Sequence, residues 1–513
     1  MKHTKNILAA ALIIFLASSC KKFIDFKPKD DYQITADDYL KTADDYQKMV
    51  IGTYSPMQWI WADVVIGDVA SDNSVSGGEN ATDQIGFQQI DDYTIVANNS
   101  YLTEAWKSCY EGINRANYLE ENKSKLDFTG KDALYGEVYF LRAYYYFELV
   151  RFFGDVPLFV DKRLSVTDSK AYPRAPKADV YAQIEKDLDN AINVLPITNI
   201  QKGRVTKYAA QALLGKVLLY QEKFDAAAAT LENVISGPFQ LVGYPNTGKF
   251  ADIFLQSGEN GPESVFEIQY SNLNPFYDWT NPGRGQGNLG VQVCGIRGLA
   301  GNSPYNQGWS TNLPTVNLAN AFTAGDTRKN VTVLDIDAYI TANQSQFPDL
   351  YASTDPRFKD KPAYLVAPYK NTGLYNQKYL PRKGETSGQV ELNYLNNYRT
   401  IRLADVLLMA AEANNRATAA NDTKAQEYLN RVRRRAFEDN QHDVTATGTA
   451  LKQAIWDERR LELAMEGDRF FDLVRTGQAA AKITGFVTGK NEVFPIPQQE
   501  VDISGLEQNP GYQ

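Results

Sequence analysis

Residues 454–475 (AIWDERRLELAMEGDRFFDLVR) constrain the fold strongly, because charges of both signs recur there at helical spacing. The charged positions, three or four residues apart, are Glu458, Arg459, Glu462, Glu466, Arg469 and Asp472. A lone buried charge is very costly, so charges opposed this regularly predict a partly buried ion-pair network on a helix. The alternative is a solvated charged face with a few exposed pairs.

Residues 204–236 predict a helix pair. Positions i, i+3, i+4, i+7 and i+8 form one apolar stripe: Ala210, Leu213, Leu214, Val217 and Leu218. A second helix begins at Phe224 and ends near Gly237-Pro238, a stop signal. Gly215, Ala227 and Leu231 keep the spacing of small and large packing positions in a tetratricopeptide repeat.

The other helical segments extend this pattern. They are predicted at about 103–121, 131–152 and 178–194, with a second pair at 402–416 and 425–437. Stacked pairs bury a shared core that no single pair could supply. The sequence therefore predicts a mainly α fold, a superhelical scaffold of tetratricopeptide-like helix pairs at about 103–237 and 400–475. Within it, at least one of Tyr144-Tyr145-Tyr146 is expected in the core.

The middle of the chain, about 238–400, differs in character. It is rich in Gly, Pro, Asn and aromatic residues, and residues 281–308 are predicted to form long loops. Residues 264–270 (SVFEIQY) alternate as a short strand would. Loops of this length in a compact domain are usually functional or disordered, and the aromatic flanks favour a ligand site here.

The N-terminus predicts export. Lys2 and Lys5 precede an apolar run at 7–17, which is too short to span a bilayer and is typical of a signal peptide at 1–19. Cys20 follows small residues, which predicts lipidation of that cysteine and a short leader over 20–33. Ala17 departs from the leucine usual in a bacterial lipobox, and an ordinary secreted protein is the alternative. A single domain is expected at 34–513.

Charge and residue usage exclude several functions. Loss of residues 1–19 moves the net charge from −9 to −11, and an acidic chain without a basic stripe is a poor nucleic-acid binder. His442 is the only histidine beyond the signal peptide, in a predicted loop, so zinc or Ser-His-Asp chemistry is disfavoured. Cys109 and Cys294 could form a disulfide or stay as two buried thiols. We expect no enzyme activity, cofactor or metal.

Carboxylate chemistry stays open as an alternative. A glycoside hydrolase needs two Asp or Glu residues about 5–10 Å apart, and this chain has 62 acidic residues.

Tryptophan placement predicts a glycan site. Trp106 and Trp456 fall on predicted helices, whereas four others fall in two regions predicted to be irregular, 59–84 and 270–285 with Tyr305 and Trp309. A sugar ring can stack its C–H face on an aromatic ring and leave its hydroxyls for polar groups. The candidate ligand-binding residues are Trp59, Trp61, Asp72, Asn73, Tyr277, Trp279, Arg284 and Trp309. Asp68, Asp72, Asn73 and Glu79 could instead bind calcium, but they miss EF-hand spacing, and a solvated loop is the simpler interpretation.

Four blocks resemble the SusD/RagB family in the family's order. They are residues 135–159 with Phe-Gly-Asp-Val-Pro, residues 402–437, the 454–475 block, and residues 494–512 ending in Gln-Asn-Pro-Gly-Tyr. The resemblance implies an outer-membrane lipoprotein, acylated (palmitate) at Cys20 and facing the cell exterior. It also implies capture of an oligosaccharide or polysaccharide and delivery to a SusC-like TonB-dependent transporter. The RagB side of the family makes a peptide the alternative ligand.

Overall fold

The computed structural model describes residues 39–164, 166–199, 201–271, 273, 285–299, 301–348, 368–386 and 391–512. Four sequence-predicted positions lie outside these ranges, namely Cys20, Tyr277, Trp279 and Arg284. No helix among the described residues is long and apolar enough to cross a membrane.

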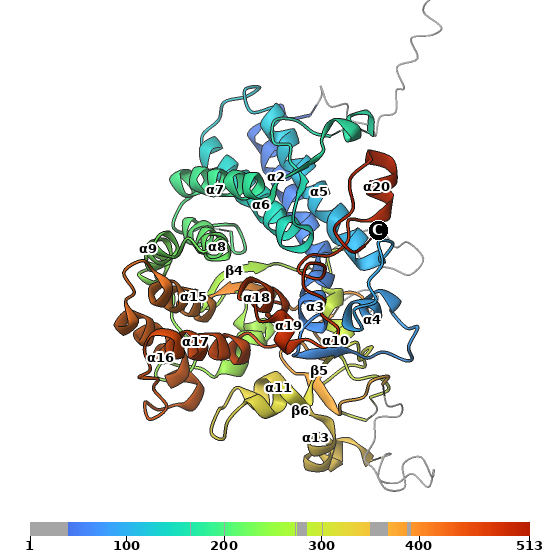
Figure 1. Ribbon diagram of the computed structural model, residues 1–513, viewed down its shortest axis with the longest axis vertical. Helices are drawn as coiled ribbons and strands as arrows, with labels where there is room; N and C mark the ends of the chain where they lie inside the picture. Colours follow the sequence, from blue (N-terminus) through green and yellow to red (C-terminus); the bar gives the residue numbers. More distant parts are fainter. Residues whose placement is uncertain are drawn as a thin grey trace, which may run out of the picture.

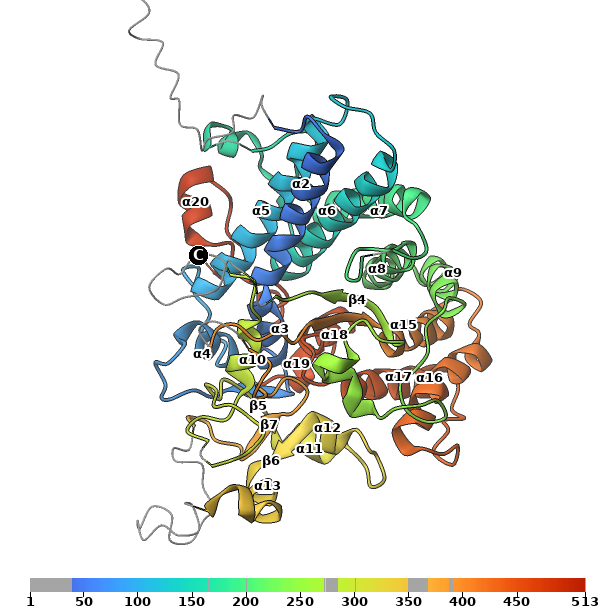
Figure 2. The same ribbon diagram turned by 180° about the vertical axis from the view of Figure 1, so that it is seen from behind.

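A stack of helices forms the scaffold and confirms the mainly α, helix-pair fold (Figures 1 and 2). Its helices are α2 (Ala43–Trp59), α5 (Ser100–Glu121), α6 (Lys131–Phe153), α7 (Lys177–Val194), α8 (Lys207–Tyr220), α9 (Phe224–Ile235), α15 (Leu403–Arg416), α16 (Asp422–Phe437) and α17 (Gly448–Glu462). Consecutive members of this series pack on one another, and α15 packs on α9 although nearly 170 residues separate them. The superhelix therefore continues across the loop-rich middle of the chain.

The α8–α9 pair shows how the sequence specifies this packing. Thr206 caps α8 by accepting a hydrogen bond from the backbone N–H of Ala209. Ala227 and Leu231 on α9 are fully buried. A Cβ atom at Gly215 would lie 2.3 Å from Cδ2 of Leu231, so only glycine permits this helix–helix approach.

Helix α6 is buried on nearly all sides. Tyr144, Tyr145 and Tyr146 are at most 4% exposed, so all three belong to the core. The Tyr145 hydroxyl donates to the Thr53 carbonyl at 2.7 Å, and the Tyr146 hydroxyl donates to the Phe159 carbonyl at 2.8 Å. These bonds let phenol groups lie in the interior without an unsatisfied polar atom.

Among the described residues, four two-stranded antiparallel sheets join segments that are separate in sequence. The pairs are β1 (Ser74–Ser76) with β5 (Asn312–Pro314), β2 (Val156–Pro157) with β3 (Arg174–Ala175), β4 (Ser264–Ile268) with β8 (Tyr398–Arg402), and β6 (Val333–Asp335) with β7 (Leu374–Asn376). Strand β4 confirms the strand predicted at 264–270. Short helices fill the remainder: α3 (Trp61–Val69), α4 (Ile85–Asp91), α10 (Leu289–Cys294), α11 (Val316–Ala321), α12 (Lys329–Thr332), α13 (Ile336–Ala342), α18 (Arg469–Arg475), α19 (Ala479–Lys482) and α20 (Gln498–Ser504).

The 454–475 block is two helices, so the expectation of one helix was wrong. Helix α17 ends at Glu462, and α18 begins at Arg469. Between them Met465 and Gly467 adopt positive φ angles of 64° and 85°. The turn lies directly against α3, because a Cβ atom at Gly67 would be 1.8 Å from the Gly467 carbonyl oxygen.

The charges of this block form the buried network that the sequence predicted. Glu462, fully buried, accepts hydrogen bonds from Arg402 and Arg435 and from Arg328 at 2.9 Å. Burial alone would raise the pKa of Glu462, but the three guanidinium groups hold it well below its ordinary value. The carboxylate therefore stays ionised in the core.

Arg402 lies at the centre of this first cluster. Its guanidinium binds both carboxylate oxygens of Glu466, at 2.9 and 2.8 Å, and reaches Glu263 at 3.0 Å. Lys378 contacts the same Glu466 at 2.6 Å. Burial lowers the pKa of Lys378 to about 8 despite that carboxylate. Strand β8, the segment before β4, the segment after β7 and the α17–α18 turn are thus joined by charge.

A second cluster lies between α8, α15, α17 and α18. Arg459 binds Asp405 at 2.7 Å and Asp472 at 3.1 Å. Arg475 bridges Asp472 and Glu412, and Lys216 donates to Asp468 at 2.8 Å. The six charges that indicated a network are therefore all buried: Glu458, Arg459, Glu462, Glu466, Arg469 and Asp472 are at most 8% exposed.

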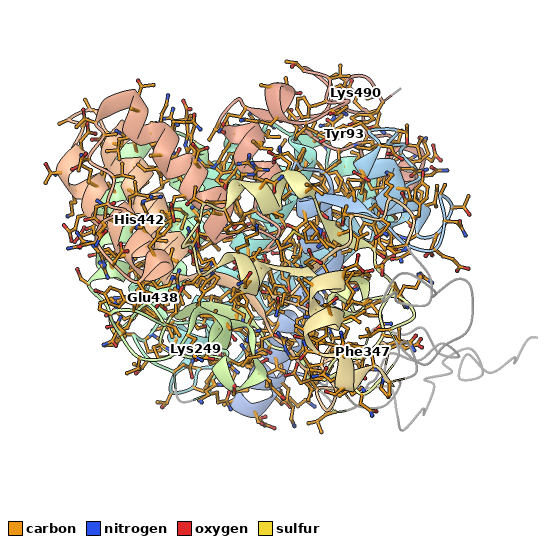
Figure 3. All side chains as sticks on the ribbon, turned by 90° about the horizontal axis from the view of Figure 1, so that it is seen from below. Tyr93, Lys249, Phe347, Glu438, His442 and Lys490 are labelled. Atoms are coloured by element: carbon orange, nitrogen blue, oxygen red, sulfur yellow. The ribbon has the colours of Figure 1, made fainter. Side chains whose placement is uncertain are left out.

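Cys109 on α5 and Cys294 on α10 are two separate buried thiols. Burial raises the pKa of both thiols. His442 lies in the loop between α16 and α17, as predicted (Figure 3). Its ring stacks on Phe437 with centroids 4.0 Å apart, and its Nδ1 lies 2.9 Å from Asp439.

We expect Arg402→Met to lower the free energy of unfolding by about 3–5 kcal/mol, because it leaves three buried carboxylates short of their shared cation. Urea denaturation followed by circular dichroism measures the change. Arg434→Met is the matched control, since Arg434 pairs with Asp443 at the surface and is 45% exposed. That control should cost less than about 1 kcal/mol. Equal losses in the two variants would contradict the central role of Arg402.

Candidate functional site

Part of the first predicted segment, 59–84, pairs with residues that follow Trp309 of the second. Strand β1 pairs with β5, with Ser74 opposite Pro314. The ladder continues beyond the strands, where Gly77 and Gly78 donate to the carbonyls of Thr311 and Ser310, each at 2.8 Å. Figures 1 and 2 show α3, α4, α10 and β5 gathered at this face. We call it the loop face.

The first two tryptophans lie on helices, so their assignment to irregular segments was wrong. Trp59 is the last residue of α2, and the Arg115 guanidinium lies 5.2 Å from its ring centroid. Trp61 begins α3 and is half-buried. Its ring meets Phe87 and Tyr101 edge-on at 6.3 and 6.1 Å. Those contacts hold the indole in place on the loop face.

A small hollow opens beside Trp61. Its walls include Val64, Tyr270, Asn288, Asn312, Asn376, Tyr379 and Tyr398. The volume is about 20 Å³, which is enough for about one water molecule. A saccharide ring would therefore have to lie across the loop face rather than inside this hollow.

Trp309 lies on the other side of the face and is half-buried. Its backbone N–H donates to the Gln292 carbonyl at 2.9 Å, and its carbonyl accepts from Arg297 at 3.3 Å. Arg297 also pairs with Asp83 at 2.9 Å. The structure thus adds Arg297 and Asp83 as residues that join the two segments. Sequence reasoning missed them because 214 residues separate the pair.

Asp72 and Asn73 are bound by arginines of the C-terminal block. Arg469 contacts both Asp72 oxygens, at 2.7 and 3.0 Å, and Arg460 donates to the Asn73 side chain at 2.8 Å. Burial raises the pKa of Asp72, but Arg469 outweighs it and leaves the pKa below its ordinary value. Ligand contact by these two side chains would require breaking those bonds.

The acidic segment 68–79 is not a solvated loop. Asp68 is fully buried and accepts from the side chain of Asn312 at 2.8 Å and from the backbone of Gly467 at 3.0 Å. Burial raises the pKa of Asp68 to about 7. Throughout the described ranges, His, Cys, Asp and Glu residues form no group of three that could hold a metal ion.

The family models match both ends of the chain. Residues 22–219 match a family described as starch-binding and associating with the outer membrane, and residues 366–512 match the SusD family. A SusD-like protein, P2, from Formosa agariphila is 29% identical over 83% of this chain and 80% of its own length. A solved laminarin-binding SusD-like protein is 34% identical, with a TM-score of 0.80 over 92% of this chain and 100% of its own.

The chain belongs to the SusD/RagB family. Surface glycan-binding protein A of Bacteroides thetaiotaomicron, solved with laminarihexaose, is 26% identical with a TM-score of 0.78, covering 91% of this chain and 99% of that one.

In this SusD-family chain, a buried carboxyl lies beneath the loop face. Asp63 is 4% exposed, and neither of its oxygens has a hydrogen-bond partner. A second hollow of about 10 Å³ borders it, with Trp61, Tyr270, Glu148 and Arg151 among the other walls. Burial, followed by the charge of Glu148, raises the pKa of Asp63 well above its ordinary value.

Asp63→Asn should raise the free energy of unfolding at pH 8 by about 1–3 kcal/mol, because it removes an unpaired buried carboxylate. A folded-state pKa above the unfolded one means that wild-type stability falls as pH rises between the two values. The gain should therefore be smaller at pH 5 than at pH 8, as measured by urea unfolding at each pH.

Asp72→Asn is a control that should change the free energy of unfolding in the opposite direction. Its lowered pKa stabilises the folded state above the unfolded pKa, so this variant should be less stable than wild type at both pH 5 and pH 8. A gain from Asp63→Asn that did not change with pH would contradict the assignment of Asp63 as a destabilising acid.

Proposed function

We propose that this protein captures an oligosaccharide at the loop face without breaking any bond in it. The observation that carries the proposal is the similarity along the whole chain to a laminarin-binding SusD-like protein, at 34% identity. The loop face adds physical support, because Trp61 and Trp309 are both half-buried there beside polar groups. A half-buried indole keeps part of its ring surface for stacking on the C–H face of a sugar.

The ligand class follows from the same relatives. One is named for laminarin binding and another was solved with laminarihexaose. We therefore propose a laminarin-type glucan as the first ligand to test. Three further ligand contacts remain predictions in addition to Trp61 and Trp309. They are Tyr277, Trp279 and Arg284, which lie outside the described residues.

The cellular role rests on the family and on the N-terminal sequence. We propose lipidation at Cys20, attachment to the outer membrane with the body of 34–513 facing the exterior, and delivery of the glycan to a SusC-like TonB-dependent transporter. The lipid would hold the protein beside the transporter, and the leader 20–33 would connect it to the folded body.

The Trp61→Ala and Trp309→Ala variants should each weaken laminarihexaose binding about tenfold or more, because each removes an aromatic ring worth about 1–2 kcal/mol of buried apolar area. Calorimetric titration of the mature protein, with chromatography of the sugar afterwards, measures both affinity and turnover. Trp456→Ala is the matched control, because Trp456 is a half-buried tryptophan on α17, in the helix scaffold.

The outcomes separate the rival functions. Unchanged affinity for laminarihexaose in both loop-face variants would show that the binding site is not on this face. Binding of peptides alone would favour the peptide-uptake alternative. New saccharide products, lost on replacement of one acid, would favour a carboxylate-dependent hydrolase.

A further inference from the structure

A groove that the loop face does not include runs along one side of α5. It consists of two adjoining hollows of about 340 and 470 Å³, which share Glu111 and Asn114. The first is lined by Trp106, Lys107, Tyr110, Glu111, Asn114, Pro157, Phe159, Leu164, Glu500, Ser504 and Leu506. The second is lined by Tyr39, Met49, Glu111, Asn114, Arg115, Tyr118 and Arg163. We call the two together the α5 groove.

The floor of the α5 groove is a stripe of α5 itself. Trp106, Tyr110, Asn114 and Tyr118 follow one another at four-residue intervals, which places them along one face of the helix. At 1.5 Å per residue the stripe is about 18 Å long. Three of its four side chains are aromatic, but Trp106 and Tyr118 are at most 8% exposed, so the half-buried Tyr110 and Asn114 are the side chains that the floor offers to a ligand.

The walls hold this floor in a fixed shape. The Tyr110 hydroxyl donates to the Pro157 carbonyl at 2.9 Å, and its ring stacks on Phe159 with centroids 5.6 Å apart. The Asn114 side-chain oxygen accepts from the backbone of Leu164 at 2.9 Å. Helix α20 closes one side, and Figures 1 and 2 both show it beside α5. A preformed groove lowers the entropy that binding would cost.

The charges at the rim are compensated within the protein. Arg115 pairs with Glu111 at 2.7 Å, and Arg163 pairs with Glu121 at 2.8 Å. Glu500 on α20 lies near Lys107 on α5, whose positive charge partly offsets the rise in the Glu500 pKa caused by burial. A strongly charged ligand would have to compete with these pairs. A neutral ligand with an apolar face and hydroxyl edges would not.

From this arrangement we infer that the α5 groove is a second oligosaccharide-binding site, separate from the loop face. The inference shares only the ligand class with the proposed function. Tyr101, in the first turn of α5, contacts Trp61 at the loop face, whereas the groove begins at Trp106. Five residues along a helix turn the side chain by about 140°, so the two sites use different sides of α5. One long glycan held at both sites would bind more tightly than at either alone.

Filling the groove tests the inference. Ser504→Trp places an indole from α20 into the first hollow, and Glu111→Trp fills the point that both hollows share. Ile503→Trp is the matched control, because Ile503 is the neighbouring residue and is 45% exposed. Native mass spectrometry and calorimetric titration of the mature protein with hexaoses of β-1,3-, β-1,4- and α-1,4-linked glucose give the number of sites and each Kd. Unchanged circular dichroism verifies folding.

We expect the wild type to have two sites. The Kd of one site should rise at least tenfold in both groove variants. That site should keep its Kd in Ile503→Trp and in a Trp61→Ala, Trp309→Ala double variant. A single site that survives both groove variants would overturn the inference and leave the proposed function intact. A single site lost only in the groove variants would support the groove and overturn the loop face. Binding of peptides alone, or of no hexaose, would overturn the glycan assignment of both sites.

Discussion

The packing of the C-terminal helices on the rest of the structure depends on the pairing of Arg402 with Glu462 and Glu466 in the buried interior. A guanidinium there needs several carboxylate oxygens at once, and Arg402 finds them on Glu263, Glu462 and Glu466. Those acids come from the segment before β4 and from the α17–α18 turn. Three parts of the chain, namely strand β8, the segment before β4 and the α17–α18 turn, are thereby fixed in one arrangement.

The same C-terminal block positions the loop face. Its turn packs on α3 at Gly67, its backbone N–H at Gly467 binds Asp68, and Arg469 binds Asp72. Tyr398, which borders both hollows near Trp61, donates to the Glu466 carbonyl at 2.6 Å. Helix α3 and Tyr398, which border the hollows of the face, are therefore held by the C-terminal block.

The sequence predicted the scaffold well because helix pairs have a local pattern. The stripe at 210–218 and the small residue Gly215 carry the packing information within some twenty residues, and α8 and α9 follow it. The buried charges were also predictable, because positive and negative residues on a solvated helix face need not recur at spacings that pair them. The helix break at 463–468 was missed because it is caused by contact with α3, which is distant in sequence.

The loop face was predictable only in outline. Composition indicated two segments, and in the structure the first pairs through β1 with β5, which follows Trp309 of the second. Composition could not show that Asp72 and Asn73 would be bound by Arg469 and Arg460, nearly 400 residues away. Trp61 was placed in a loop because α3 is buried on nearly all sides, which hides the helical period. Trp59 follows Pro56, a residue that by sequence rules ends or kinks a helix.

The long separations in the charge network also bear on how the chain reaches its native state. Lys216 meets Asp468 only after 252 further residues, and Arg328 meets Glu462 only after 134. Before those acids are present, Arg328 has Asp326 as a buried partner and Lys216 has Asp405. Contacts between residues this far apart in sequence form slowly. The last fifty or so residues therefore complete a charge network whose other members are already in the chain.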